Sequence, residues 1–150
     1  MKPLSLTLKN FGPYINETID FTKFEDSSLF LISGKTGSGK TTIFDGMSYA
    51  LFGESSGKLR LGKEMRSTFA DPSEATEVTL LFKHNEYLYE LNRLPEQELF
   101  KKRGTGARKQ SAKISLIVKD AQGKELRAYS KRREVDELIQ ELLHLNANQF

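Results

Sequence analysis

The feature that most constrains this 150-residue sequence is a glycine-rich octapeptide, GKTGSGKT, at residues 34–41. It fits the pattern Gly-x-x-x-x-Gly-Lys-[Ser/Thr] and has a third glycine inside it. Successive backbone amides can point into one concavity only where the chain adopts conformations that a Cβ opposes, which is why glycines recur in such loops. The octapeptide therefore predicts a loop that wraps a phosphate group.

The residues on either side of the octapeptide have the patterns that a phosphate-binding loop requires. Residues 29–33 begin with four consecutive apolar side chains, as in a strand that is covered on both faces. Across residues 42–52 apolar side chains recur at helical spacing, and Gly53 follows as a stop. The order strand, loop and helix is the context that supports the motif against a chance match.

The loop residues have expected roles in binding ATP and Mg²⁺. We expect Lys40 to contact the β- and γ-phosphates, Thr41 to offer its hydroxyl to Mg²⁺, and Thr42 to contact the α-phosphate. The helix that begins near Lys40 adds free amides and the positive end of its dipole. The predicted nucleotide-binding residues are Gly34, Lys35, Thr36, Gly37, Ser38, Gly39, Lys40, Thr41 and Thr42.

The rest of the chain is predicted to form an α/β domain. A period of two predicts strands over residues 4–9, 15–21, 77–82, 87–94, 113–118 and 125–129. The first two are expected to pair as a hairpin through a connection, 10–14, that is longer than a minimal turn. Residues 54–76 are expected to be irregular. A helical stripe predicts a helix over 134–145, with Ser130 as a candidate cap.

Composition restricts the class of protein. With 37% hydrophobic and 29% charged residues, the chain can bury one core of its own. It has no cysteine, no apolar run long enough to span a bilayer and no pattern of a signal peptide. We therefore expect a soluble, cytoplasmic protein without disulfides. His84 and His144 are too isolated to predict a metal site.

A basic segment, residues 101–113, holds six cations and no acid although the formal net charge of the chain is only +3. Its glycines, Gly104 and Gly106, indicate a mobile loop whose cations are solvated. A second interpretation stays open, because clustered cations also bind phosphate backbones. In that case the candidate DNA contacts are Lys101, Lys102, Arg103, Arg108 and Lys109.

Three ordered strings, LTLKNFGPY, IDF and LFLISGKTGSGKTTIFDGMSYALFGE, resemble the N-terminal ATPase segment of the SbcC family of exonuclease subunits. The residues most specific to this resemblance are Thr36, Asp45 and the YALFG string at 49–53. The resemblance covers essentially the whole chain. The resemblance implies a P-loop NTPase fold of the ABC-type ATPase head. Residues 1–150 would form its N-terminal half, lobe I, with an antiparallel β subdomain beside a mainly parallel core.

The resemblance also implies partners and activity. Members act in DNA repair and recombination as ATPases coupled to a nuclease, and ATP drives their heads to dimerise. The implied partners are the C-terminal half of the same head, a second copy, an SbcD-like nuclease subunit and double-stranded DNA. The resemblance places Gly12, Arg66 and Ser67 near the base and ribose. An SMC- or RecF-like head and a non-catalytic nucleotide-sensing module stay open as alternatives.

The acidic residues that hydrolysis requires are not recognised within residues 1–150. Asp120 follows an apolar run, but Lys119 interrupts the run and Ala121 stands where a catalytic Glu is expected. Asp120 is therefore expected to open a turn. Gln149 comes before the expected position of the family's loop glutamine. We expect a truncated head with no catalytic residue, able to bind nucleotide and inactive in hydrolysis by itself.

Overall fold

The computed structural model describes residues 1–24, 40–53, 73–101 and 103–143. Two α-helices, α1 (Lys40–Phe52) and α2 (Arg132–Leu143), and the 3₁₀ turn η1 (Phe21–Phe24) accompany eight strands. The strands are β1 (Lys2–Phe11), β2 (Tyr14–Asp20), β3 (Glu77–His84), β4 (Tyr87–Leu94), β5 (Gln97–Phe100), β6 (Ala107–Gln110), β7 (Lys113–Lys119) and β8 (Glu125–Tyr129).

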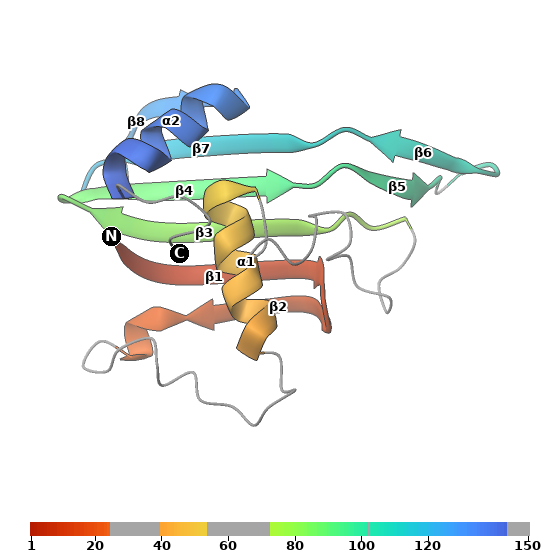
Figure 1. Cartoon of the computed structure of the whole chain (residues 1–150), viewed down its shortest axis with the longest axis horizontal. Coiled ribbons are helices and arrows are strands. Elements are labelled where there is room, and N and C mark those ends of the chain that lie inside the picture. The colour runs from red at the N-terminus through yellow and green to blue at the C-terminus, as the bar shows by residue number, and fades with distance from the viewer. Residues whose placement is uncertain (25–39, 54–72, 102, 144–150) are drawn as a thin grey trace.

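Six of the strands form one antiparallel sheet in the order β2-β1-β3-β4-β7-β8 (Figure 1). Every adjacent pair is antiparallel, and short turns join β1 to β2, β3 to β4 and β7 to β8. Strands β5 and β6 pair with each other in a separate two-stranded sheet, and Figure 1 shows this hairpin continuing beyond the ends of β4 and β7. The hairpin therefore projects from the domain as an arm.

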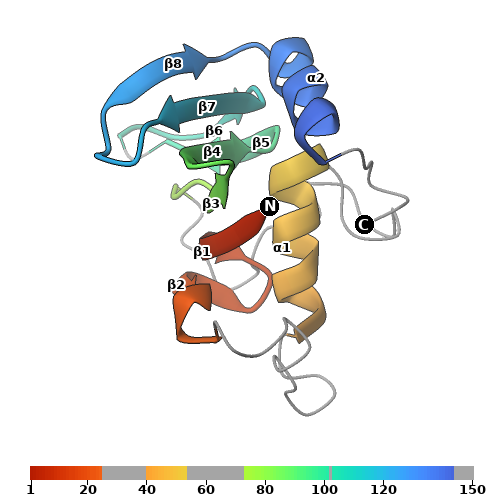
Figure 2. The same ribbon diagram turned by 90° about the vertical axis from the view of Figure 1, so that its left-hand side faces the viewer.

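Both helices lie against the same face of the six-stranded sheet (Figure 2). Alternate side chains of the strands point to this face, and the buried ones form the core with the apolar side chains of the helices. The largest fully buried side chains are Phe11, Phe82, Leu6, Leu8, Met47, Leu51, Leu80, Leu91, Leu116, Ile139 and Val78. Tyr89 also belongs to this core, because its ring stacks on Phe82 with centroids 4.9 Å apart.

The antiparallel β subdomain predicted from the sequence is confirmed, with differences at the turns. The connection between β1 and β2 is a minimal one, since Phe11 pairs with Tyr14 and only Gly12 and Pro13 lie between them. The expected longer connection is wrong because Gly12, at φ 56°, supplies the left-handed conformation that the first central position of a tight turn needs. The predicted parallel core, including the strand at 29–33, lies outside the described residues.

The prediction that the basic segment, residues 101–113, is a loop is wrong for part of it. Residues 107–110 form β6 and pair with β5, so the loop proper is the short tip of a hairpin. Lys101 donates its backbone N–H to the carbonyl of Gly106 and closes that tip. The sequence does not predict β6, because this strand is exposed and carries charged side chains. A half-buried strand would have apolar side chains at alternate positions.

The prediction that Asp120 opens a turn is confirmed. Its carboxylate Oδ1 accepts hydrogen bonds from the backbone N–H groups of Gln122 and Lys124, both at 2.9 Å. Its carbonyl also accepts from Gly123. The predicted cap of α2 is wrong, because the helix begins at Arg132 and the carbonyl of Lys131, rather than Ser130, accepts its first helical hydrogen bond.

Candidate nucleotide-binding site

The described part of the predicted nucleotide site is the first turn of helix α1. Residues 34–39, Arg66 and Ser67 lie outside the described residues, whereas the backbone of Lys40, Thr41 and Thr42 opens α1. The first amides of a helix have no partner within it and form its positive end. No acidic residue lies in the first turn of α1. This end of the helix therefore fits an anionic ligand such as a phosphate.

The middle of α1 is fixed by a close approach to the sheet. Gly46 faces β1, and a Cβ added to it would lie 2.7 Å from Cδ2 of Leu8. Only a residue without a side chain lets the helix backbone come this near to the strand. Met47, Ala50 and Leu51 pack into the core around this contact. The position of α1 on the sheet is thus set by shape as well as by burial.

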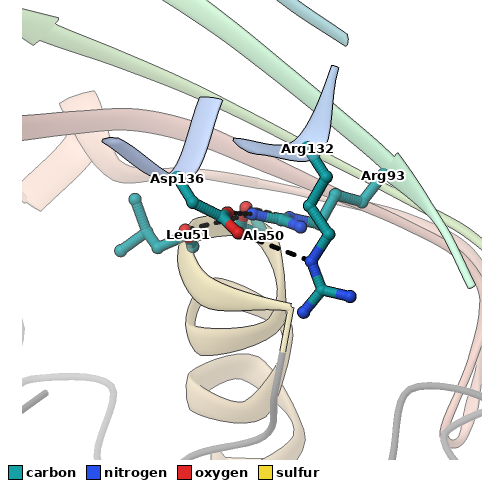
Figure 3. Close-up of polar contacts among 5 residues, drawn as sticks. All are labelled: Ala50, Leu51, Arg93, Arg132 and Asp136. Carbon is teal, nitrogen blue, oxygen red and sulfur yellow. Dashed lines mark hydrogen bonds and ion pairs between the residues drawn. The ribbon is translucent and has the colours of Figure 1, made fainter. Parts of the chain in front are cut away.

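The C-terminal end of α1 is held by a buried arginine of strand β4 (Figure 3). Arg93 is only 4% exposed. Its Nε donates to the carbonyl of Ala50 at 2.7 Å, and its Nη2 donates to the carbonyl of Leu51 at 3.2 Å. Carbonyls in the last turn of a helix lack partners within the helix, and a cation there also meets the negative end of its dipole. Arg93 therefore caps α1 from the sheet.

An ion pair connects Arg93 to helix α2. Nη2 of Arg93 lies 3.0 Å from Oδ1 of Asp136, and Nε of Arg132 lies 3.4 Å from Oδ2 of the same carboxylate. Burial lowers the pKa of the Arg93 guanidinium, and the hydrogen bond and charge of Asp136 oppose that shift. Because arginine has a very high intrinsic pKa, it stays charged here. One guanidinium thus joins β4, α1 and α2.

Buried hydrogen bonds connect the β1–β2 turn, which holds Gly12, to the residues just before β3 and to the start of β5. Asn10 donates from Nδ2 to the carbonyl of Ala75 at 2.9 Å, and Thr76 donates its hydroxyl to the carbonyl of Asn10 at 2.8 Å. Gln97 accepts from the N–H of Thr76 and donates to its carbonyl. This network fixes the β1–β2 turn relative to the root of the β5–β6 hairpin. No contact among the described residues tests the prediction that Gly12 lies near the base of the nucleotide.

The candidate DNA contacts lie on the β5–β6 hairpin. Lys101, Arg103, Arg108 and Lys109 are all exposed, and Lys102 lies outside the described residues. Lys109 forms an ion pair with Glu96 at 2.9 Å, which raises the pKa of the Lys109 ammonium. Arg108 donates from Nη1 to Oε1 of Gln110. The cations of the tip are thus more available than Lys109 to a polyanion.

Sequence reasoning missed the residues that hold α1 and its neighbouring turn, namely Arg93, Asp136, Asn10, Thr76 and Gln97. A weak signal existed for Arg93, which stands at an inward position of a strand where an apolar side chain is expected. Its partners are more than forty residues away in sequence, so no local pattern points to them.

Two negative findings apply to residues 1–24, 40–53, 73–101 and 103–143. In these ranges no group of three or more His, Asp or Glu side chains is placed to hold a metal ion. No helix in the same ranges is long and apolar enough to cross a membrane.

The family of the chain follows from its sequence as a whole. The family model AAA_23, described as an AAA domain, matches residues 5–150, and the chain belongs to this family. Relatives named as the C subunit of the SbcCD nuclease are 47% identical over 154 residues in Lactococcus lactis subsp. lactis (strain IL1403) and 44% identical over 151 residues in Vibrio cholerae serotype O1. Another, from Staphylococcus aureus (strain JH9), is 45% identical over 150 residues.

These alignments include the whole of this chain but little of each relative. The chain spans 14% of the Lactococcus and Staphylococcus proteins and 15% of the Vibrio protein. The resemblance to the N-terminal segment of SbcC that the motifs indicated is confirmed.

Proposed function

We propose that this chain is the ATP-binding N-terminal part of an ATPase subunit in a cytoplasmic nuclease complex that processes DNA ends and hairpins. The observation that carries the proposal is the complete phosphate-loop pattern at residues 34–41, directly followed by helix α1 from Lys40. The name of the relatives, which are SbcC proteins of the SbcCD nuclease, supports the nuclease complex.

In this proposal the loop amides and Lys40 bind the phosphates of ATP, and Thr41 binds Mg²⁺ through its hydroxyl. Magnesium neutralises phosphate charge and orients the phosphate chain when bound. The chain's own contribution is a helix whose start is free for the anion and whose end is held by Arg93. The carboxylate that would activate water is assigned to the C-terminal half of the same head, so residues 1–150 bind nucleotide without hydrolysing it.

Assembly is the second part of the proposal. ATP closes two copies of the head on each other, and an SbcD-like nuclease subunit acts on the bound double-stranded DNA. The projecting β5–β6 hairpin supports the DNA contact, because Lys101, Arg103 and Arg108 are exposed near its tip. Each phosphate that these cations neutralise releases condensed counterions, so their contribution to binding depends on salt.

Calorimetric titration of Mg-ATP into the complete polypeptide tests the nucleotide site. We expect Lys40→Ala to weaken binding about 10- to 100-fold, because the lysine forms charge-assisted hydrogen bonds to phosphate. Lys2→Ala, which removes a lysine at the start of β1, is the matched control and is expected to leave the affinity unchanged. Equal affinity of the Lys40→Ala and wild-type proteins would refute the site.

A further inference from the structure

A cavity of about 200 Å³ lies beside the C-terminal end of α1, on the opposite end of the helix from the phosphate loop. Tyr49 and Gly53 line it from α1 and its stop, Arg93 from β4, Lys113 from β7 and Arg132 from α2. Much of the remaining wall is apolar. Its charged lining residues are Arg93, Lys113, Arg132 and Glu96.

Two guanidinium groups converge on one point of this cavity. A Cβ added at Gly53 would lie 3.1 Å from Nη1 of Arg93 and 3.6 Å from Nη2 of Arg132. Figure 3 shows the Arg132 side chain descending from α2 beside Arg93 at the top of α1. Since Gly53 has no side chain, the space between the two groups stays open. Neither of these two nitrogens forms a hydrogen bond within the described part of the chain.

A third donor faces the same cavity. Tyr49 is only 5% exposed, and its hydroxyl makes no hydrogen bond within residues 1–24, 40–53, 73–101 and 103–143. Burial raises the pKa of Tyr49 to about 12, although the charges of Arg93 and Arg132 act in the opposite direction. The hydroxyl is therefore protonated at neutral pH and close to both guanidiniums. A donor that faces the cavity without a protein acceptor can bind a ligand or water there.

The charges around the cavity do not balance. Asp136 serves both arginines, at 3.0 Å from Arg93 and 3.4 Å from Arg132. Glu96 also lines the cavity, and its carboxylate forms an ion pair with Lys109. Lys113 has no ion pair among the described residues. Three cations thus face the carboxylates of Asp136 and Glu96, which leaves the cavity with an excess of positive charge.

We propose that this cavity is a second anion site, separate from the phosphate loop, that binds a phosphate-type oxyanion between Arg93, Arg132 and the Tyr49 hydroxyl. Guanidinium groups present paired N–H donors that match the oxygens of phosphate. A tetrahedral oxyanion has more acceptor oxygens than a carboxylate and so satisfies donors that arrive from α1, β4 and α2. The oxyanion has two sources, free phosphate or a phosphodiester of DNA held by the neighbouring β5–β6 hairpin.

The test uses the complete polypeptide with Lys40→Ala, so that binding at the proposed phosphate loop is weakened to the same extent in every protein compared. Thermal unfolding is followed against inorganic phosphate and, at equal ionic strength, against chloride. We expect saturable stabilisation by phosphate alone. Arg132→Met should weaken phosphate binding at least about tenfold, because it removes a charge-assisted donor, and Tyr49→Phe about fivefold. Arg133→Met, one residue along α2 and 90% exposed, is the matched control and should respond like the parent.

A second arm distinguishes the two sources. If the phosphodiester is the natural ligand, Arg132→Met also weakens binding of a short DNA duplex and phosphate competes with that duplex. If duplex binding is unchanged while phosphate binding is lost, free phosphate is the ligand. The proposal is overturned if chloride or acetate stabilises as well as phosphate, or if Arg132→Met and Arg133→Met respond alike. Because all compared proteins carry the same Lys40→Ala loop, any phosphate bound there contributes equally and cancels in the comparison of Arg132→Met with Arg133→Met.

Discussion

The two ends of helix α1 solve the same physical problem in different ways. At Lys40 the first amides of the helix follow a glycine-rich loop, and we propose that they bind an external anion. At Phe52 the free carbonyls are taken up internally, by the backbone N–H of Gly53 and by the buried guanidinium of Arg93. The comparison teaches that the last carbonyls of the helix are satisfied within the protein, whereas its first amides fit a ligand from outside.

Substitution of Arg93 is expected to cause the largest change in the free energy of unfolding. Arg93→Met leaves two carbonyls of α1 without their partner and leaves the Asp136 carboxylate with Arg132 alone. Leaving two buried acceptors unsatisfied costs about 1–3 kcal/mol each, so the free energy of unfolding should fall by about 2–6 kcal/mol. Urea denaturation of the complete polypeptide measures it. Arg133→Met, which removes an exposed pair with Glu137, should change it by less than about 0.5 kcal/mol.

Tyr49, near the C-terminal end of α1, should make the free energy of unfolding depend on pH in alkaline solution. Because burial raises its pKa to about 12 from 10.0, the unfolded chain loses the proton first as the pH rises. The contribution of Tyr49 is therefore complete below pH 10 and is lost as the pH approaches 12, with a total on the order of 2 kcal/mol.

Comparing wild type with Tyr49→Phe isolates this effect. The difference in unfolding free energy between the two proteins should change between pH 10 and 12 and be constant below pH 9. Tyr14 and Tyr89, whose pKa values burial also raises, are present in both proteins and cancel. Tyr87→Phe, at a tyrosine that is 45% exposed, is the control. A constant difference across the whole range would contradict the burial of the Tyr49 hydroxyl.

A substitution in the middle of α1, at Gly46, is expected to change the free energy of unfolding by a smaller amount. Gly46→Ala improves helix propensity by about 1 kcal/mol but places a methyl group against Leu8. Overpacking costs about 1–3 kcal/mol, so we expect a net loss near 1 kcal/mol. In a Leu8→Val background the δ-carbons are gone, and the same substitution should become neutral or stabilising. Denaturation of the four proteins completes this cycle, and additivity of the two changes would show that the close approach does not matter.

The smallest effect on stability is expected at the binding end. Without ligand, Lys40→Ala should change the free energy of unfolding by less than about 0.5 kcal/mol, because a partner outside the protein is what this lysine is expected to contact. With saturating Mg-ATP the wild-type protein should gain stability by mass action, and the variant should gain less. Thermal unfolding with and without Mg-ATP provides the measurement. A large loss of stability in the absence of ligand would mean that the two ends of α1 do not differ as described.

The sequence by itself determined the features whose causes are local. The glycine spacing at 34–41 indicates a phosphate loop, Gly53 indicates the end of α1, and Asp120 indicates the β7–β8 turn. Each depends on backbone conformations or hydrogen bonds within a few residues. The alternation of the strands likewise predicted most of the sheet, although the exposed strand β6 lacks the apolar face that makes alternation visible.

Tertiary structure alone decided which residues hold the helix in place. Arg93 reaches Ala50, Leu51 and Asp136, each more than forty residues away, and Asn10 reaches Ala75 and Thr76 across a still longer separation. A buried cation is stable only where the fold brings several acceptors to it at once. The convergence of Arg93, Arg132 and Tyr49 on one cavity has the same origin, because three elements must meet before their donors share a single space.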